Sequence, residues 1–209
     1  ASFAHSNLIG VSLDNAILKA TNFWQTDLSG QDFTVISGAS SQGSVFIEAN
    51  LSNSNFEGVD MTPVEFFTHT LENKAYLPHD LSSMSAAERL SLVRELPTGK
   101  MGGDHIFIIS TEVSGNDLVV DYIFFNSFAR ANLENANFKN AKLGYAGFYQ
   151  ANLTNADLSG ADLRKAFFGN ADLSNADLSN ANLEGAILDN AILSNANLKC
   201  INHPICNSD

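Results

Sequence analysis

Few residues of this sequence combine the types and spacing that catalysis or metal binding requires. Asp104 and His105 are adjacent, and an Asp–His pair can transfer protons. The residues that could converge on a metal ion lie in the same stretch and are His69, His79, Asp80 and His105. No nucleophile motif accompanies the Asp–His pair, and the histidine spacing matches no ligand motif. We therefore expect no catalytic residue, no metal site and no cofactor, and a protein that is not an enzyme.

The two cysteines, Cys200 and Cys206, lie near the end of the sequence, and Pro204 between them turns the chain back. A disulfide between them would clamp the end of the fold. It would indicate an oxidising, extracytoplasmic compartment such as a periplasm or a thylakoid lumen. The alternatives are free thiols in the cytoplasm and a zinc site with His203, for which the chain has no obvious fourth ligand. We expect the disulfide.

The composition restricts the possible partners. The chain carries 23 acidic and 11 basic residues, a formal net charge of -12. This balance argues against direct nucleic-acid binding, which uses clustered lysines and arginines. It is compatible with simple solubility, with a basic protein partner or with imitation of nucleic acid. No apolar run approaches the roughly 20 residues that cross a bilayer, so we expect no membrane span.

A five-residue period dominates the second half of the sequence. From Phe128 to Leu198 every fifth residue is Leu or Phe, and alanine stands two residues before each one from Ala131 to Ala196. In an extended chain, side chains two residues apart point the same way. A turn in the same sense every five residues therefore directs both side chains inward. Four such sides close a square coil of twenty residues, and coils stack at about 4.8 Å.

The repeated unit, as in Ala156-Asp157-Leu158, resembles the Ala-(Asp/Asn)-Leu-X-X motif of the pentapeptide-repeat family. The resemblance covers residues 128–198 almost completely and the N-terminal third more loosely. It suggests a bacterial, in particular a cyanobacterial, member. It implies an all-β solenoid, a right-handed quadrilateral β-helix. Members mostly lack an assigned activity, although some resemble duplex DNA and bind DNA gyrase.

The remaining sequence divides around these repeats. In the N-terminal third the period runs from Phe3 to Phe33 and, after a three-residue slip at 37–41, from Phe46 to Met61. The slip predicts a bulge or a short loop at a corner. The expected divisions are N-terminal coils over 1–61, an insertion over 62–127, C-terminal coils over 128–199 and a clamped tail over 200–209. The coils form either one solenoid or two stacks that meet at an angle.

The insertion is expected to have the order ααββ. Two capping boxes, at 62–65 and 85–88, predict helices over about 63–73 and about 85–96. The runs 106–109 and 118–123, on either side of a turn, predict a hairpin.

Twenty-residue spacing predicts which side chains stack. Phe128, Phe148 and Phe168 should form one aromatic column, and Phe3 should lie beneath Phe23. Imitation of DNA would require unbroken rows of carboxylates on the outside. The outer rows are Asn132, Asn152, Asp172 and Ile192; Asn137, Asp157, Asp177 and Asn197; and Lys142, Asp162 and Asn182. None of these rows is uniformly acidic.

We therefore expect a non-catalytic scaffold or protein-interaction module with an unidentified protein partner. A DNA gyrase-binding mimic is the alternative, and ligand binding or enzymatic activity in the insertion is a third possibility. Gly147, Phe167 and Ile187 replace the usual Asp or Asn on the wall of the Phe column. An outward apolar patch should result, made of Tyr145, Tyr149, Phe167 and Ile187. The patch is either a partner site or is covered by the insertion.

Overall fold

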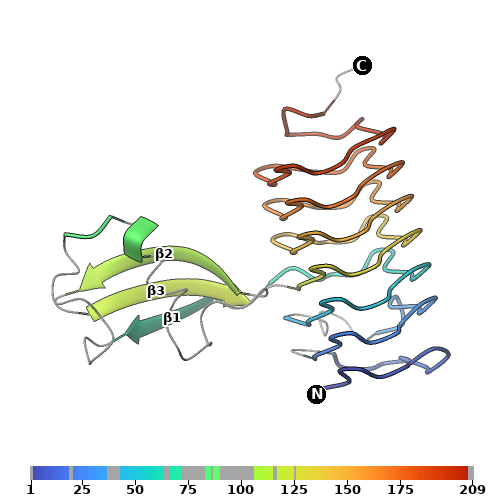
Figure 1. Cartoon of the computed structure of the whole chain (residues 1–209), viewed down its shortest axis with the longest axis horizontal. Coiled ribbons are helices and arrows are strands. Elements are labelled where there is room, and N and C mark those ends of the chain that lie inside the picture. The colour runs from blue at the N-terminus through green and yellow to red at the C-terminus, as the bar shows by residue number, and fades with distance from the viewer. Residues whose placement is uncertain are drawn as a thin grey trace. The chain divides into compact units, whose positions relative to one another are not determined.

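The computed structural model describes residues 2–18, 21–36, 43–63, 66–71, 83–85, 87–89, 106–114, 117–124 and 126–206. The chain divides into two units, one of Ala1–Pro63 with Phe125–Asp209 and one of Val64–Phe124. The first unit is a stack of coils and the second contains three strands (Figure 1). Within the described ranges, no helix has the length and apolar character that crossing a membrane requires.

Backbone bridges between parallel segments define the coils. Asn132 is bridged to Asn152, which lies 20 residues further along the chain. The Leu133 amide donates to the Asn152 carbonyl at 2.7 Å, and the Asn152 amide donates to the Ala131 carbonyl at 3.0 Å. Asn152 is bridged in turn to Asp172. Four five-residue sides therefore complete one turn, and the first unit is a four-sided β-helix.

Most corners of the coils are type II turns, with a positive φ at the third residue. The Ala131 amide donates to the Phe128 carbonyl at 3.0 Å, and Arg130 between them has a φ of 57°. A positive φ at the third residue of such a turn favours Gly and Asn, because other side chains are strained there. The Asp or Asn before each core residue accepts the amide that follows, as Asp157 Oδ1 does from Ser159 at 2.9 Å. The motif thus encodes one side and one corner.

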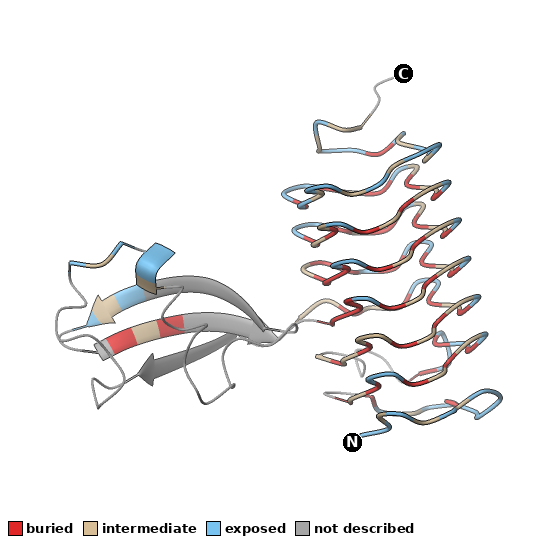
Figure 2. Cartoon of the chain, viewed as in Figure 1, coloured by how far each residue is buried: buried red, intermediate tan, exposed pale blue. Residues whose placement is uncertain are grey.

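The core consists of columns of stacked side chains. Buried residues recur from coil to coil along the solenoid (Figure 2). Phe128 lies 5.0 Å from Phe148, and Phe148 lies 4.9 Å from Phe168, between ring centroids. The full column is Phe3, Phe23, Phe46, Phe128, Phe148 and Phe168. A second column contains Phe33, Phe56 and Phe138. The columns meet edge to face, with 81° between the rings of Phe128 and Phe138.

All the coils belong to one continuous solenoid. Asn50 is bridged to Asn132, which lies 82 residues later in the sequence. This separation is one 20-residue coil plus 62 further residues, so the insertion leaves the stack and returns without changing its register. The three-residue slip is also visible in the backbone pairing. Asp27 is bridged to Asn50 at a separation of 23 residues, which is three more than a regular coil. Residues 37–41, where the slip was predicted, lie outside the described residues.

The inserted unit contains an antiparallel sheet of β1 (Phe66–Leu71), β2 (Ile106–Ser114) and β3 (Asp117–Phe124), in the order β1-β3-β2. The β2–β3 pairing confirms the predicted hairpin. The helix predicted over 63–73 is wrong, because β1 occupies its place. The run 66–71 is aromatic and β-branched, and its pairing with β3 along the whole strand outweighs the local capping signal.

The second capping box is confirmed. The Ser85 amide donates to Glu88 Oε2 at 2.7 Å, and the Glu88 amide donates to Ser85 Oγ at 3.3 Å. A helical turn follows at 87–89, and the rest of the predicted second helix lies outside the described residues. The described order is therefore β1, a helical turn, β2 and β3 rather than ααββ. Residues 62–63 and 126–127 belong to the solenoid and not to the insertion.

Candidate interaction surface

The four faces of the solenoid differ in their outward residues. We number them from the face centred on Phe128, followed by those centred on Leu133, Phe138 and Leu143, and each corner takes the number of the face before it. The outward residues of the first face are Ser2, Asn22, Val45, Ser127, Gly147, Phe167 and Ile187. Those of the third face, from the second coil on, are Asp32, Asn55, Asn137, Asp157, Asp177 and Asn197. Apart from Asn22, the first face therefore lacks the capping Asp or Asn, whereas the third face keeps it in these coils.

The corners that flank the first face are irregular as well. At the second and third corners, every described residue with positive φ is Asn or Gly. The exceptions to that rule in the coils lie at the first corner (His5, Gln25, Glu48, Arg130 and Gln150) and at the fourth (Tyr145 and Lys165). Each such residue costs about 1 kcal/mol or more in backbone strain. We call the first face, with the first and fourth corners, the irregular side.

The predicted apolar patch lies on the irregular side and is partly exposed. Tyr149 and Ile187 are 46% and 42% exposed, whereas Tyr145 and Phe167 are half-buried. Gly147, on the same face, is buried. The most accessible part of the patch is therefore Tyr149 and Ile187.

Contacts within the solenoid fix the two tyrosine rings. A Cβ atom on Gly169 would lie 3.3 Å from Tyr149 Cδ2, so the absence of a side chain there makes room for the ring. At the fourth corner, Lys165 Nζ donates to the Tyr145 hydroxyl at 3.1 Å and lies 5.2 Å from the centre of that ring. Rings held in this way lose little entropy when they are covered.

A second cluster on the first corner centres on Glu48. Its Oε2 accepts hydrogen bonds from Gln25 Nε2 at 2.7 Å and Trp24 Nε1 at 3.3 Å, and its Oε1 accepts one from Arg130 Nε at 2.9 Å. The bonds from Gln25 and then Arg130 lower the pKa of Glu48, which keeps it ionised. The His5 ring lies 4.8 Å from Trp24, whose side chain is 41% exposed. Sequence reasoning missed this cluster.

The sequence carries a signal for it. The residue two positions after each core phenylalanine of the first face should be Asn or Gly. In the first four coils this position is instead occupied by His5, Gln25, Glu48 and Arg130. A residue-by-residue comparison of the corners therefore identifies the first corner without coordinates.

Asn126 joins the coil on either side of the insertion, and sequence reasoning missed it too. Its Oδ1 accepts the Ser44 amide at 3.0 Å, and its Nδ2 donates to the Met61 carbonyl at 2.7 Å. Asn126 and Ser44 are buried. The side chain thus satisfies backbone groups that the insertion would otherwise leave unpaired.

The outer rows form hydrogen-bonded ladders. Asn152 Nδ2 donates to Asn132 Oδ1 at 3.0 Å, and Asn197 Nδ2 donates to Asp177 Oδ1 at 2.9 Å. On the second and third faces, the asparagines that interrupt the carboxylates are donors in these ladders. Such interrupted rows differ from the continuous charge that duplex DNA presents.

The other candidate residues do not form a chemical site in the described part of the chain. Cys200 and Cys206 form the predicted disulfide, with Cα atoms 5.0 Å apart, and Ile205 in this loop packs against the core. Among the described residues, no three His, Cys, Asp or Glu side chains gather as metal ligands would. His69 lies in β1, and the other predicted candidates, His79, Asp80, Asp104 and His105, lie outside the described residues.

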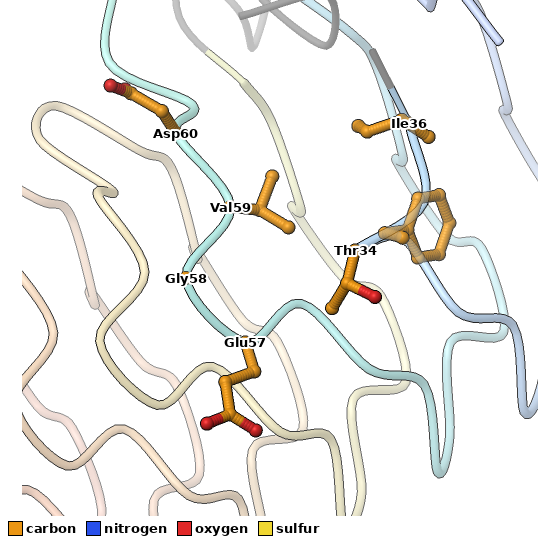
Figure 3. Close-up of a pocket in the computed structure, with 7 residues that line it drawn as sticks. Thr34, Ile36, Glu57, Gly58, Val59 and Asp60 are labelled. Atoms are coloured by element: carbon orange, nitrogen blue, oxygen red, sulfur yellow. The ribbon is translucent and has the colours of Figure 1, made fainter. Parts of the chain in front are cut away.

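A hollow of about 400 Å³ lies beside the three-residue slip. Its lining residues are Phe33, Thr34, Ile36, Glu57, Gly58, Val59 and Asp60. Val59 and Ile36 point toward one another across it, whereas the carboxylates of Glu57 and Asp60 point away (Figure 3). Asp60 bonds instead to Lys142 Nζ at 2.9 Å. Since its polar groups do not converge, this hollow lacks the features of a binding site.

These stacked four-sided coils define a right-handed β-helix repeat solenoid. Residues 1–34, 32–62, 131–170 and 168–199 match the family described as pentapeptide repeats, in eight copies. More than half of the sequence is matched, and the chain belongs to the pentapeptide repeat family. Among curated proteins, none matches this chain.

Several solved structures are similar. A pentapeptide repeat protein from the Arabidopsis thaliana thylakoid lumen is 48% identical over 34% of this chain and 49% of that one, with a TM-score of 0.33. The pentapeptide repeat protein Rfr23 from the cyanobacterium Cyanothece 51142 is 16% identical over 87% of this chain and 88% of that one, with a TM-score of 0.36. QnrB1, a plasmid-mediated fluoroquinolone resistance protein, is 15% identical over 97% and 94%, with a TM-score of 0.26. With TM-scores this low, these likenesses add nothing to the family assignment.

Proposed function

We propose that this chain is a non-catalytic scaffold that binds a protein partner through the irregular side. The observation that carries the proposal is the distribution of strained corner residues, because in the described coils those other than Asn and Gly all flank the first face. Backbone strain that persists in a fold tends to mark functional positions. The exposed side chains on this side include Trp24 and Tyr149, of types that supply much of the binding energy at protein interfaces.

The test is partner capture from the source organism with chemical cross-linking. The double variant Trp24→Ala and Tyr149→Ala removes two exposed aromatic rings of the irregular side. The matched control is Glu134→Ala with Lys139→Ala, which removes side chains from the second and third corners. We expect the first variant to lose the cross-linked partner and the control to keep it. Equal capture by both variants would contradict the proposal.

An oxidising compartment, such as a periplasm or a thylakoid lumen, is the proposed location. Support comes from the disulfide between Cys200 and Cys206, since structural disulfides persist where thiols are not kept reduced. Mass spectrometry of protein taken from its source under alkylating conditions tests this location. Alkylated Cys200 and Cys206 in native material would indicate the cytoplasm instead.

A further inference from the structure

We infer that the first corner around Trp24 receives a basic segment of the partner, with an arginine or lysine side chain on the exposed indole. The inference rests on the proposed function and adds the chemistry of the partner. It concerns the N-terminal coils, where Trp24 lies close to the acidic residues Glu48 and Asp27.

Trp24 is held in its binding orientation before a partner arrives. Its indole N–H donates to Glu48, its backbone amide donates to Asn22 Oδ1 at 2.9 Å, and His5 lies against the ring. The ring is nevertheless 41% exposed. An exposed ring whose rotamer is already fixed binds without the entropy loss that a free side chain would suffer.

The charges around this ring favour a cation. Residues 1–61 contain six acids and a single base, Lys19, and two of these acids, Asp27 and Glu48, lie at or next to the first corner. Asp27 is the outward residue of the second face in the coil of Trp24, so it lies just past the first corner. Glu48 lies against the indole itself. The whole chain, at -12, also attracts basic partners over longer distances.

The indole supplies the short-range part of this attraction. Tryptophan is the best aromatic acceptor for an ammonium or guanidinium group, and such a contact contributes about 0.5–1 kcal/mol at an exposed site. Arg130 already pairs with Glu48, so the incoming cation is held by the ring face and by Asp27 rather than by Glu48 alone. An acidic partner or a nucleic acid would be repelled by the same set of carboxylates.

The chain offers a direct probe, because Trp24 is its single tryptophan. An oligo-arginine peptide is titrated against the full chain while indole fluorescence is recorded, with an oligo-glutamate peptide of equal length as the comparison. We expect a saturable change with the basic peptide alone, and an affinity that falls as salt rises.

Matched variants distinguish this corner from general attraction to an acidic protein. Asp27→Asn removes one charge while keeping an oxygen acceptor, and Asn50 occupies the same position one coil later, so the fold tolerates it. Asp177→Asn makes the same change on the third face. We expect Asp27→Asn to weaken binding about two- to fivefold and Asp177→Asn to change it much less. Calorimetry with Trp24→Leu should show a loss of roughly two- to fivefold.

Several results would overturn the inference: no response to oligo-arginine, equal weakening by both Asp variants, or a salt-independent response to a neutral oligosaccharide instead. If the natural partner still requires Trp24 and Tyr149 while oligo-arginine gives no response, the basic chemistry is wrong and the proposed function stands. If capture of the partner requires neither Trp24 nor Tyr149, the proposed function fails regardless of the result of the oligo-arginine titration.

Discussion

Asn126 Nδ2 donates to the carbonyl oxygen of Met61 at 2.7 Å, across 65 residues of sequence. Met61 is the last core residue before the insertion, and Asn126 precedes the next, Phe128, by two positions. The same side chain accepts the amide of Ser44, which lies in the preceding coil, at 3.0 Å. The contact closes the coil where the insertion interrupts it. It explains why the coils before and after the insertion stack in the same register.

Loss of this side chain should destabilise the solenoid strongly. Asn126→Ala leaves the Ser44 amide and the Met61 carbonyl without their partner, and we expect a loss of about 3 kcal/mol in the free energy of unfolding. Urea denaturation measures it. The control is Asn152→Ala in the half-buried outer ladder, which should lose about 1 kcal/mol or less. Equal losses in the two variants would show that Asn126 has no special role.

Removal of the insertion should leave a folded solenoid. Deletion of residues 64–125 joins Pro63 to Asn126 and returns the bridged pairs to 20-residue spacing. Pro63 would then occupy a corner that needs a positive φ, which proline cannot adopt, so the variant also carries Pro63→Asn. We expect cooperative unfolding and the circular dichroism of a β-helix.

A frame-shifted deletion is the control for this experiment. Deleting 64–126 removes one residue more, which breaks the spacing and discards Asn126. We expect this second variant to aggregate or to unfold at much lower urea. If both deletions fail, the solenoid depends on the insertion for its stability.

The phenylalanine column should tolerate a change of shape better than a loss of volume. Phe148 is fully buried, so Phe148→Ala should cost about 3–5 kcal/mol. Phe148→Leu should cost much less, because Leu188 follows Phe168 in the same column. Phe3→Ala, at a ring that is 39% exposed, should have the smallest effect. Thermal unfolding of the three variants tests this order.

Acid should destabilise the fold partly through Glu48. Hydrogen bonds from Gln25 and then Arg130 lower its pKa below the ordinary 4.5, so the folded state binds fewer protons than the unfolded state near and below that pH. The stability that Glu48 provides is present above pH 4.5 and is lost as the pH falls through the folded pKa. Urea midpoints measured from neutrality down to about pH 3.5 should fall less steeply for Glu48→Gln than for Glu134→Gln. Identical slopes would contradict this role.

The solenoid can be predicted from the sequence because each five-residue repeat contains all the residues that determine one side and one corner of a coil. Ala and Leu, two residues apart, define an inward-facing side, and the following Asn or Gly fits the left-handed turn residue. Stacking order then follows from counting, which is why Phe148 lies over Phe128. The disulfide is predictable for the same reason, since Cys200 and Cys206 are close in sequence.

The errors lie where distant segments decide the structure. The capping signal before β1 is local, but the pairing that makes β1 a strand comes from β3, about 50 residues later along the chain. Asn126 stands where the repeat expects alanine, and nothing near it in the sequence reveals its contacts with Ser44 and Met61. The first-corner cluster was predictable from the corner residues, because its members recur at the spacing of the coils.

The central claim, that the irregular side is the interaction surface, is tested most directly by hydroxyl-radical footprinting of the chain with and without its captured partner. Side-chain oxidation is the suitable readout, because the amides of Tyr145 and Phe167 are already bonded within the solenoid. The account predicts that Trp24 and Tyr149 become protected, while Ile9 at the second corner and Ile192 on the second face stay as reactive as in the free chain. Unchanged oxidation of Trp24 and Tyr149, with protection of Ile9 and Ile192, would contradict it.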